Sequence, residues 1–504
     1  MIQKLNVFVV IFIFLIIGKP ITATVSLDNI SQVVVDFNKF AEDSFEKSEV
    51  PGVAIAIVYQ NQVKYLKCFG VRKKGFTQPI DVDTVFQIAS CSKAFTAALI
   101  ASLVGEGLVG WDDQVINYYP EFRLFDPYVT SQLTIRDLLS HRNGLPSFIG
   151  DNLEDNFLYS TKEILYRLRF QKPVSGFRSK YAYQNYDVTA AGETVVKLTG
   201  KKWSKLISER IFKPLNMNSS CAAFADFTKE ENKALPHSLK NGKFSLHSLH
   251  NSDTQAPAAS ISSSIQDMIK WVKMQLNEGM YDGKRIINAK ALQETHKSQI
   301  VINSLEDEID TYGLCWDVLY KSGQKIVTHE GAFESGINSL VCLIPSLEAG
   351  LIVLTNGYPC GLTTALGKTF QDLFIKGHCE VDWWPIMNEK ISKAMKDLLE
   401  PDHPLLNPPS KKTPSLPLTA YEGEYQNSFF GKIQIIQKND YLFLYLGNNK
   451  IPHQLTHWDR DIFKDENQST GVCFTVGEKN QTTQVLLDAF NYDGRDGLFQ
   501  RIGK

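Results

Sequence analysis

The segment FQIASCSKAFTAALIASLVGEGL, residues 86–108, predicts the centre of the fold. It begins as a short extended stretch and continues as a helix that is apolar on nearly every face from Phe95 to Val104. A helix that is apolar all round is buried in the core of a large protein. We therefore expect the other elements to pack around this helix.

Two polar residues stand at the buried start of this helix. Ser90 and Lys93 are three apart, which places them on one helical face with Cβ atoms about 5–6 Å apart. The helix start adds unpaired N–H groups and the positive end of the helix dipole, which favour negative charge at Ser90. A lysine in such a site has a lowered pKa, so the pair predicts a nucleophile with its own base.

The same spacing occurs at Ser44 and Lys47, in a predicted surface helix. The pattern Ser-x-x-Lys is therefore weak by itself, and most instances are structural. The context of Ser90 is different, because a charged lysine at the head of an apolar helix is costly unless the site uses it.

The 504-residue chain has a nearly balanced charge of −2, which does not indicate a nucleic-acid partner. Residues 1–23 resemble a secretory signal peptide, with a lysine near the start, an apolar core over residues 5–17 and a small-residue site near Ala23. The core is shorter than the ~17–25 residues of a membrane span, which makes an uncleaved anchor the lesser alternative. We expect a secreted, extracellular protein with no stable membrane span after signal removal.

Eight cysteines would meet oxidising conditions after secretion. Cys360 and Cys379 lie in loop-like sequence and are candidates for a bridge. Buried thiols are predicted in strand-like runs at Cys68, Cys315, Cys342 and Cys473. No Cys-x-x-Cys pair indicates zinc or redox chemistry, and we expect neither a metal nor a cofactor. Sequons that suit a glycoprotein, in about the number expected by chance, occur at Asn29, Asn218, Asn467 and Asn480.

The order of apolar patterns predicts the architecture of a first domain over residues 24–400. An amphipathic helix over 30–45 precedes a hairpin with strands at 53–59 and 63–69. A helix-rich region follows the central helix as far as residue 277. Strands are then predicted at 312–319, 325–329, 337–344 and 350–355, followed by a helix near 362–375. This order predicts an α/β (α+β) fold, with one antiparallel sheet flanked by helices and an all-helical lobe.

The C-terminal part is predicted to be a separate, small β-barrel over residues 418–504. Six prolines between residues 401 and 417 prevent helix or central strand and indicate a linker. Short alternating strands are predicted beyond it at 432–438, 441–446, 471–476 and 484–487, with turn residues between them. Strands and turns at this spacing are typical of a small barrel.

Two further polar motifs complete a set of three. Tyr183-Gln184-Asn185 lies in the helical region, and His329-Glu330-Gly331 ends one predicted strand just before another. With Ser90-Cys91-Ser92-Lys93 these match, in order and spacing, the motifs of serine β-lactamase-related hydrolases. The chain most resembles the branch of class C β-lactamases, D-amino-acid peptidases and esterases, of the peptidase S12 type. The likeness covers about residues 27 to 380 and includes framework segments at 51–54, 138–146, 257–259 and 353–356.

The resemblance implies a β-lactamase/transpeptidase-like fold and a role for each matching residue. Ser90 would attack a carbonyl while Lys93 takes or eases its proton. Tyr183 would be the general base for the deacylating water, with its phenol pKa lowered by the neighbouring ammonium. Further implied roles are substrate binding by Asn185, His329 and Gly331, and an oxyanion hole from the N–H groups of Ser90 and Ala332. The segments 418–425 and 455–458 resemble the lipocalin-like domain that some of these hydrolases carry.

Each of these residues also has a structural interpretation. Tyr183 could be a core tyrosine, Asn185 a helix cap and His329 a satisfied strand histidine. Phe333 stands where His-Glu-x-x-His would need its second histidine, which argues against zinc. The chain also lacks the Gly-x-Ser-x-Gly of α/β-hydrolases.

The sequence therefore predicts a secreted serine hydrolase that forms an acyl-enzyme on a small amide, ester or peptide substrate. His329 stands where a β-lactamase usually has lysine, and a histidine of pKa about 6.5 is mostly neutral at pH 7. This departure argues against efficient penicillin turnover. The alternatives are an inactive extracellular matrix or binding protein on the same fold, and a peptidase for D-amino-acid peptides. The oligomeric state is left open.

Overall fold

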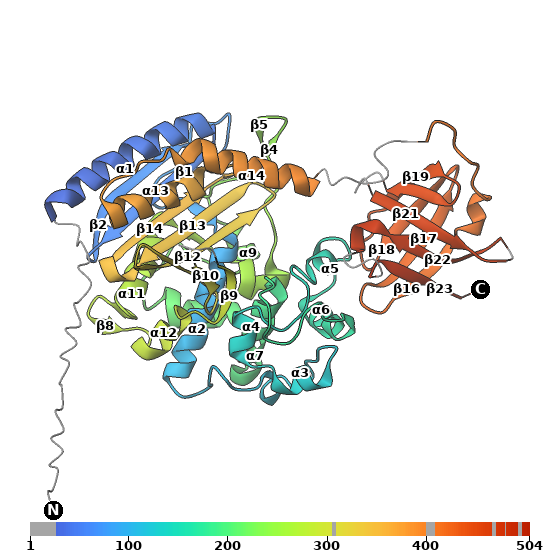
Figure 1. The fold of residues 1–504 in the computed structure, drawn as a ribbon, viewed down its shortest axis with the longest axis horizontal. Coiled ribbons are helices and arrows are strands. Elements are labelled where there is room, and N and C mark those ends of the chain that lie inside the picture. The colour runs from blue at the N-terminus through green and yellow to red at the C-terminus, as the bar shows by residue number, and fades with distance from the viewer. Residues whose placement is uncertain are drawn as a thin grey trace, which may run out of the picture.

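The computed structural model describes residues 27–304, 309–399, 409–465, 470–478, 480–491 and 496–503. The predicted signal peptide, residues 1–23, lies outside these residues, as does the first half of the predicted linker. Figure 1 shows a large body that holds the N-terminal elements and a barrel that lies beside it.

The large body is built on an eight-stranded sheet in the order β2-β1-β14-β13-β12-β11-β10-β9. Every neighbouring pair is antiparallel, as the sequence predicted. The strands are β1 (Gly52–Tyr59), β2 (Gln62–Gly70), β9 (Ile300–Ser304), β10 (Ile309–Tyr312), β11 (Asp317–Lys321), β12 (Gln324–Phe333), β13 (Ile337–Ile344) and β14 (Ala349–Thr355).

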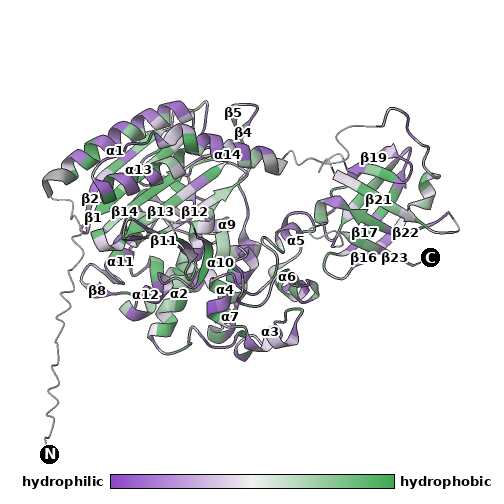
Figure 2. Cartoon of the chain, in the orientation of Figure 1, coloured by the Kyte–Doolittle hydropathy of each residue, from purple (hydrophilic) through white to green (hydrophobic). Residues whose placement is uncertain are grey.

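Both faces of this sheet are buried, which explains the continuous apolar runs of its central strands. Val53, Ile55 and Ile57 of β1 belong to one apolar core, and the alternating Ala54 and Ala56 belong to another. Three helices cover the first face (Figure 1), namely α1 (Leu27–Ser48), α13 (Leu362–Lys376) and α14 (Trp383–Leu399). Figure 2 shows that their outer surfaces are largely hydrophilic while the central strands are hydrophobic.

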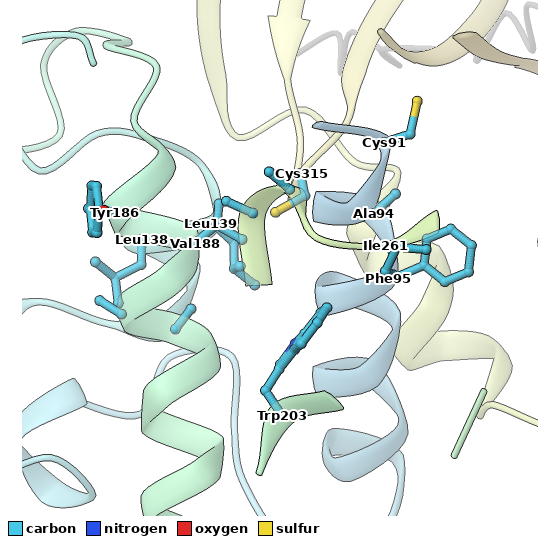
Figure 3. Close-up of a cluster of buried hydrophobic side chains, with 14 of the residues drawn as sticks. Cys91, Ala94, Phe95, Leu138, Leu139, Tyr186, Val188, Trp203, Ile261 and Cys315 are labelled. Atoms are coloured by element: carbon cyan, nitrogen blue, oxygen red, sulfur yellow. The ribbon is translucent and has the colours of Figure 1, made fainter. Parts of the chain in front are cut away.

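The second face carries α11 (Ile265–Leu276) and the helical lobe. The helix α2 (Ser92–Gly105) runs through the centre of the lobe and is buried from Ser92 to Leu103, as predicted. Figure 3 shows Trp203 beside α2, on the side that faces the neighbouring helix α7, which carries Tyr186 and Val188. The other helices are α3 (Pro127–Gln132), α4 (Ile135–Leu139), α5 (Asp151–Asp155), α6 (Thr161–Arg167), α7 (Asn185–Thr199), α8 (Trp203–Ile207), α9 (Phe224–Phe227), α10 (Ala256–Ala259) and α12 (Ala289–Thr295).

Short strands interrupt the lobe, so it is not entirely helical. The pairs are β3 (Val85–Gln87) with β6 (Ser262–Ser264), and β7 (Met280–Tyr281) with β8 (Lys284–Arg285). A third small sheet joins β15 (Gly357–Tyr358), β4 (His237–Lys240) and β5 (Lys243–Leu246). The predicted strand 312–319 is also broken, because Gly313 N–H bonds to the carbonyl of Trp316 at 2.7 Å and Cys315 has a φ of 63°.

The C-terminal strands form a closed, antiparallel, eight-stranded barrel, which confirms the predicted barrel fold. Its strands are β16 (Gly423–Asn427), β17 (Gly431–Lys438), β18 (Tyr441–Leu446), β19 (His453–Asp459), β20 (Ile462–Asp465), β21 (Thr470–Val476), β22 (Thr482–Leu487) and β23 (Leu498–Ile502). Aromatic side chains fill the interior, including Tyr421, Tyr425 and Phe499, each fully buried. Closure leaves no unpaired strand edge.

The barrel packs against the segment between α5 and α6 (Figure 1). The ring of Phe157, which is fully buried, lies 5.6 Å from that of Phe430 and 5.3 Å from that of Phe490. Tyr159 O–H donates to the carbonyl of Phe430 at 3.0 Å. A Cβ at Gly447 would lie 2.9 Å from Tyr159, so this close approach depends on glycine. The two domains therefore share an apolar contact.

All eight cysteines are free thiols, so the predicted Cys360–Cys379 bridge is wrong. The physical reason is α13: Cys360 lies just before its first residue, whereas Cys379 Sγ lies 3.8 Å from Asp372, about 15 Å further along the helix and beyond the reach of a disulfide. No helix in the described ranges combines the length and the apolar character that crossing a membrane requires. Of the sequon asparagines, Asn218 and Asn480 are exposed, and the side chains of Asn29 and Asn467 lie outside the described residues.

Candidate active site

Ser90 and Lys93 meet as their spacing predicted. Lys93 Nζ donates to Ser90 Oγ at 2.9 Å. Ser90 lies in the 3₁₀ turn Ala89–Cys91 that leads into α2, and the preceding Ala89 has a φ of 43°. A left-handed conformation at a residue with a side chain is strained, and such strain is concentrated at functional sites. The turn thus presents the hydroxyl of Ser90 at the start of a buried helix.

Lys93 is fully buried at the base of this site. Its amine also donates to Asn185 Oδ1 at 2.6 Å and to the carbonyl of Ala258 at 3.2 Å. Burial lowers the pKa of Lys93 from 10.5 to about 7. A large share of the molecules therefore holds a neutral amine at physiological pH, and a neutral amine can accept the proton of Ser90.

The second Ser-x-x-Lys pair has no such arrangement. Ser44 is fully buried on the inner side of α1, and Lys47 is exposed and pairs with Asp43 at 2.6 Å. The amine of Lys47 is thus directed to a surface carboxylate, and the pair is structural.

Tyr183 also reaches Ser90, because its O–H donates to Ser90 Oγ at 2.8 Å. Lys93 Nζ lies 4.7 Å from the centre of its ring. The expected lowering of the tyrosine pKa is wrong. Burial raises the pKa of Tyr183 well above its ordinary value and outweighs the lowering effect of its hydrogen bond to Ser90. Tyr183 is therefore a neutral phenol and a hydrogen-bond donor at neutral pH.

Asn185 joins Lys93 to a carboxyl group that sequence reasoning missed. It is the first residue of α7, and its Nδ2 donates to Asp151 Oδ2 at 2.9 Å while Oδ1 accepts from Lys93. Burial raises the pKa of Asp151 to about 7. No local pattern identifies Asp151, because it reaches the site only through the packing of α5 against the start of α7.

The third motif, His329-Glu330-Gly331, brings a backbone segment next to Ser90 and places no charged imidazole there. His329 is 3% exposed, its Nδ1 bonds to the carbonyl of Glu330 at 2.7 Å and its Nε2 accepts from Tyr312 O–H at 3.1 Å. Burial lowers the pKa of His329 to about 3, so the ring is neutral. Both ring nitrogens are occupied, and His329 does not line the cleft over Ser90. Substrate binding by His329 is not proposed further.

Gly331 allows β12 to lie directly against the nucleophile turn. A Cβ at Gly331 would lie 2.3 Å from the carbonyl oxygen of Ile88 and 2.8 Å from Ser90 N, so no larger residue fits without movement. The next residue, Ala332, lines the cleft beside Ser90. Cys91 is buried, and its Sγ donates to the carbonyl of His329 at 3.3 Å. Its predicted packing role fits this position.

The site opens into a cleft of about 730 Å³. Ser90, Tyr183 and Asn185 line its floor, together with Phe148, Ala332 and Phe333. The rest of the lining combines the apolar Leu239, Ala259, Pro359 and Met395 with the polar and charged Asp151, Asp155, Ser238, Lys240, His247, His250, Gln255, Glu334 and Ser335. No set of three or more histidine, cysteine, aspartate or glutamate residues within the described ranges is arranged to hold a metal ion.

Comparison with known proteins bears on both domains. The Beta-lactamase family matches residues 37–363, and a domain of unknown function, DUF3471, matches residues 407–501. Unguisins hydrolase ungD' of Aspergillus campestris is 25% identical over 449 residues, 84% of this chain and 81% of the relative. Beta-lactamase-like protein 2 of Dictyostelium discoideum is 24% identical over 420 residues, 82% of this chain and 73% of the relative.

A bacterial relative and a solved structure match at similar levels. Protein flp of Staphylococcus aureus N315 is 26% identical over 335 residues, 66% of this chain and 64% of that protein. The octameric penicillin-binding protein homologue from Pyrococcus abyssi superposes with a TM-score of 0.61 at 20% identity, covering 93% of this chain and all of that one. At this level of identity, the superposition shows that the two chains share a fold.

Proposed function

This chain belongs to the beta-lactamase family, and we propose that it is a serine hydrolase that forms an acyl-enzyme at Ser90 on a small amide or ester. The observation that carries the proposal is the convergence of Lys93 Nζ and Tyr183 O–H on Ser90 Oγ, at 2.9 and 2.8 Å, on the floor of the cleft. A nucleophile with a base at hydrogen-bond distance and a further group that orients it is the arrangement that covalent catalysis requires.

Lys93 is the proposed base of acylation. The neutral amine takes the proton of Ser90 as Oγ attacks the substrate carbonyl, and the N–H groups of Ser90 and Ala332 stabilise the oxyanion. Tyr183 then donates its O–H proton to the departing alkoxide or amine, and the Lys93 ammonium restores that proton. The proton of Ser90 thus leaves with the first product, and the acyl group stays on Oγ.

Lys93 is also the proposed base of deacylation. Its amine, neutral again, takes a proton from water as the water attacks the acyl carbonyl. That proton returns to Ser90 Oγ as the ester bond to the serine breaks. The high pKa of Tyr183 supports this assignment, because a phenol that stays protonated cannot activate water as a base.

The neutral state of the His329 ring bears on which class of substrate the site can bind. His329 is uncharged and its ring nitrogens are both occupied, so it offers no cation to a substrate carboxylate. We therefore propose esters and amides rather than penicillins. The pattern of residues 1–23 supports action after secretion, which sequencing the N-terminus of protein recovered from the culture medium would test.

A fluorophosphonate probe tests the proposal. We expect one labelled peptide, the one that contains Ser90, and no labelling of the Ser90→Ala variant. The matched control is Ser44→Ala, which removes the serine of the second Ser-x-x-Lys pair and should leave labelling intact. Labelling of Ser92 or Ser335 in place of Ser90 would overturn the assignment, and absence of any labelling would favour an inactive binding protein.

A further inference from the structure

Three carboxyl groups lie on one side of the cleft, and they have no role in the proposed reaction. Asp151 and Asp155 come from the two ends of α5, and Glu334 follows β12. The group has a fixed position relative to the nucleophile, because Asp151 contacts Asn185, Asn185 contacts Lys93 and Lys93 contacts Ser90, at 2.9, 2.6 and 2.9 Å. Only two side chains, those of Asn185 and Lys93, therefore lie between the carboxyl group of Asp151 and Ser90 Oγ.

Buried polar atoms around the same cleft lack hydrogen-bond partners. Ser238, Gln255 and Ser335 line the cleft and are only 5%, 6% and 8% exposed. Ser238 Oγ, Gln255 Oε1 and Ser335 Oγ, together with Asp151 Oδ1, are buried atoms without a partner in the described part of the chain. Such atoms are rare in folded proteins, and each requires an explanation. Unpartnered oxygens on residues that line a cleft are explained by a ligand that supplies hydrogen-bond donors once small side-chain movements expose them.

The electrostatic environment of the carboxyl groups indicates the charge of that ligand. Burial raises the pKa of Asp151 to about 7. Partial loss of solvent and the carboxylate of Glu334 raise the pKa of Asp155 to about 6. Lys240 and the imidazoles of His247 and His250 also line the cleft. A cation bound between the carboxyl groups would favour their charged forms.

Building on the proposed hydrolase, we propose that the cleft selects substrates whose acyl group carries an organic cation with N–H donors, an ammonium or a guanidinium, held by Asp151, Asp155 and Glu334. The unpartnered oxygens of Ser238, Gln255 and Ser335 accept further hydrogen bonds from the same polar acyl group. The carboxyl groups are not spaced as metal ligands, so an organic cation is the better fit. A guanidinium suits this arrangement, because its planar fork of donors can bind two carboxylates at once.

Rigid p-nitrophenyl esters provide the test, because their arms cannot cyclise onto the ester. The three probes are the 4-guanidinobenzoate, the 4-acetamidobenzoate and the 4-sulfobenzoate, and the readout is the second-order rate constant of the nitrophenol burst. We expect the guanidinium ester to acylate Ser90 at least about tenfold faster than the acetamido ester, with the sulfonate slowest.

Charge variants locate the preference within the cleft. In Asp155→Asn combined with Glu334→Gln, the ratio of guanidinium to acetamido rate should fall about tenfold. The charge-reversed pair Asp155→Lys and Glu334→Lys should favour the sulfonate ester. The matched control is Glu424→Gln, which removes an exposed carboxylate on β16 of the barrel and should leave the ratio unchanged. Circular dichroism and thermal melting establish that each variant is folded.

The outcomes separate this inference from the proposed function. If the acetamido ester and the fluorophosphonate react at Ser90 but the guanidinium ester has no advantage, the cation site is wrong and the hydrolase stands. The same conclusion follows if folded charge variants keep the wild-type ratio. If neither ester nor fluorophosphonate reacts at Ser90, both proposals are overturned.

Discussion

Raising the pH from 6 to 8 should speed the acylation of Ser90 about tenfold, with a midpoint near the Lys93 pKa of about 7. The pKa is lowered, so the neutral base form is lost as the pH falls. About one lysine in eleven is neutral at pH 6 and about ten in eleven at pH 8. A lysine with its ordinary pKa of 10.5 would instead be almost fully protonated throughout this range.

The assay is the rate of labelling by a fluorophosphonate without titratable groups, measured with excess probe from pH 5.5 to 10. The rate should rise through pH 7 and be constant by about pH 9. Lys93→Met should lower the plateau by about 10²–10⁴ and remove the rise. A rate that is constant between pH 6 and 8 in folded protein, or one that rises only above pH 9, would refute the reasoning.

Asp151 is the group that could produce a similar profile, because its pKa is also raised to about 7. It reaches Lys93 through Asn185, so the two titrations are coupled. The carboxylate of Asp151 raises the pKa of Lys93. The variant Asp151→Asn should therefore keep the rise and move its midpoint to lower pH. Loss of the rise in this variant would identify Asp151 as the titrating group.

Three other changes test single contacts of the structure. Tyr183→Phe removes the donor to Ser90 Oγ and should lower steady-state ester turnover about 10²–10⁴-fold, and wild-type turnover would contradict its role. Gly331→Ala places a Cβ 2.8 Å from Ser90 N, so urea unfolding should give a loss of about 1–3 kcal/mol together with slower labelling; unchanged values would contradict the close approach. Phe157→Ala removes the ring that the barrel contacts and should cost about 3–5 kcal/mol in the same assay, with the half-exposed Phe125→Ala as control; equal effects would contradict the interface.

The sequence predicted the sheet and the contact between Ser90 and Lys93 because both leave local patterns. The central strands are buried on two faces, so β14 and the second half of β13, from Leu340 to Ile344, are apolar runs that the composition reveals. Ser90 and Lys93 share one helical turn, so their contact follows from helix geometry. The helix α14 was missed, although it is amphipathic and covers the sheet beside α13. The breaks in the lobe, where strands of two or three residues pair, are too short to give a periodic signal.

The charge state of the site could not be predicted, because it depends on two opposing effects of unknown size. A nearby ammonium lowers the pKa of a tyrosine and burial raises it. The sequence places Tyr183 near Lys93 but gives no measure of how completely the fold removes water from the phenol. In the structure burial dominates for both residues, which lowers the pKa of the lysine and raises that of the tyrosine. These directions support the proposal of Lys93, rather than Tyr183, as the base.

The linker sequence alone leaves the position of the barrel open, whereas the structure places the barrel against the segment that follows α5. Asn448 N–H donates to the carbonyl of Phe157 at 2.9 Å, next to the aromatic contacts of Phe157 with the barrel. Phe157 follows α5 by two residues, and α5 carries Asp151, which holds Asn185. A barrel that fixes the end of α5 also fixes the carboxyl side of the cleft. The small domain thus supports one wall of the site, while none of its described residues belongs to the lining.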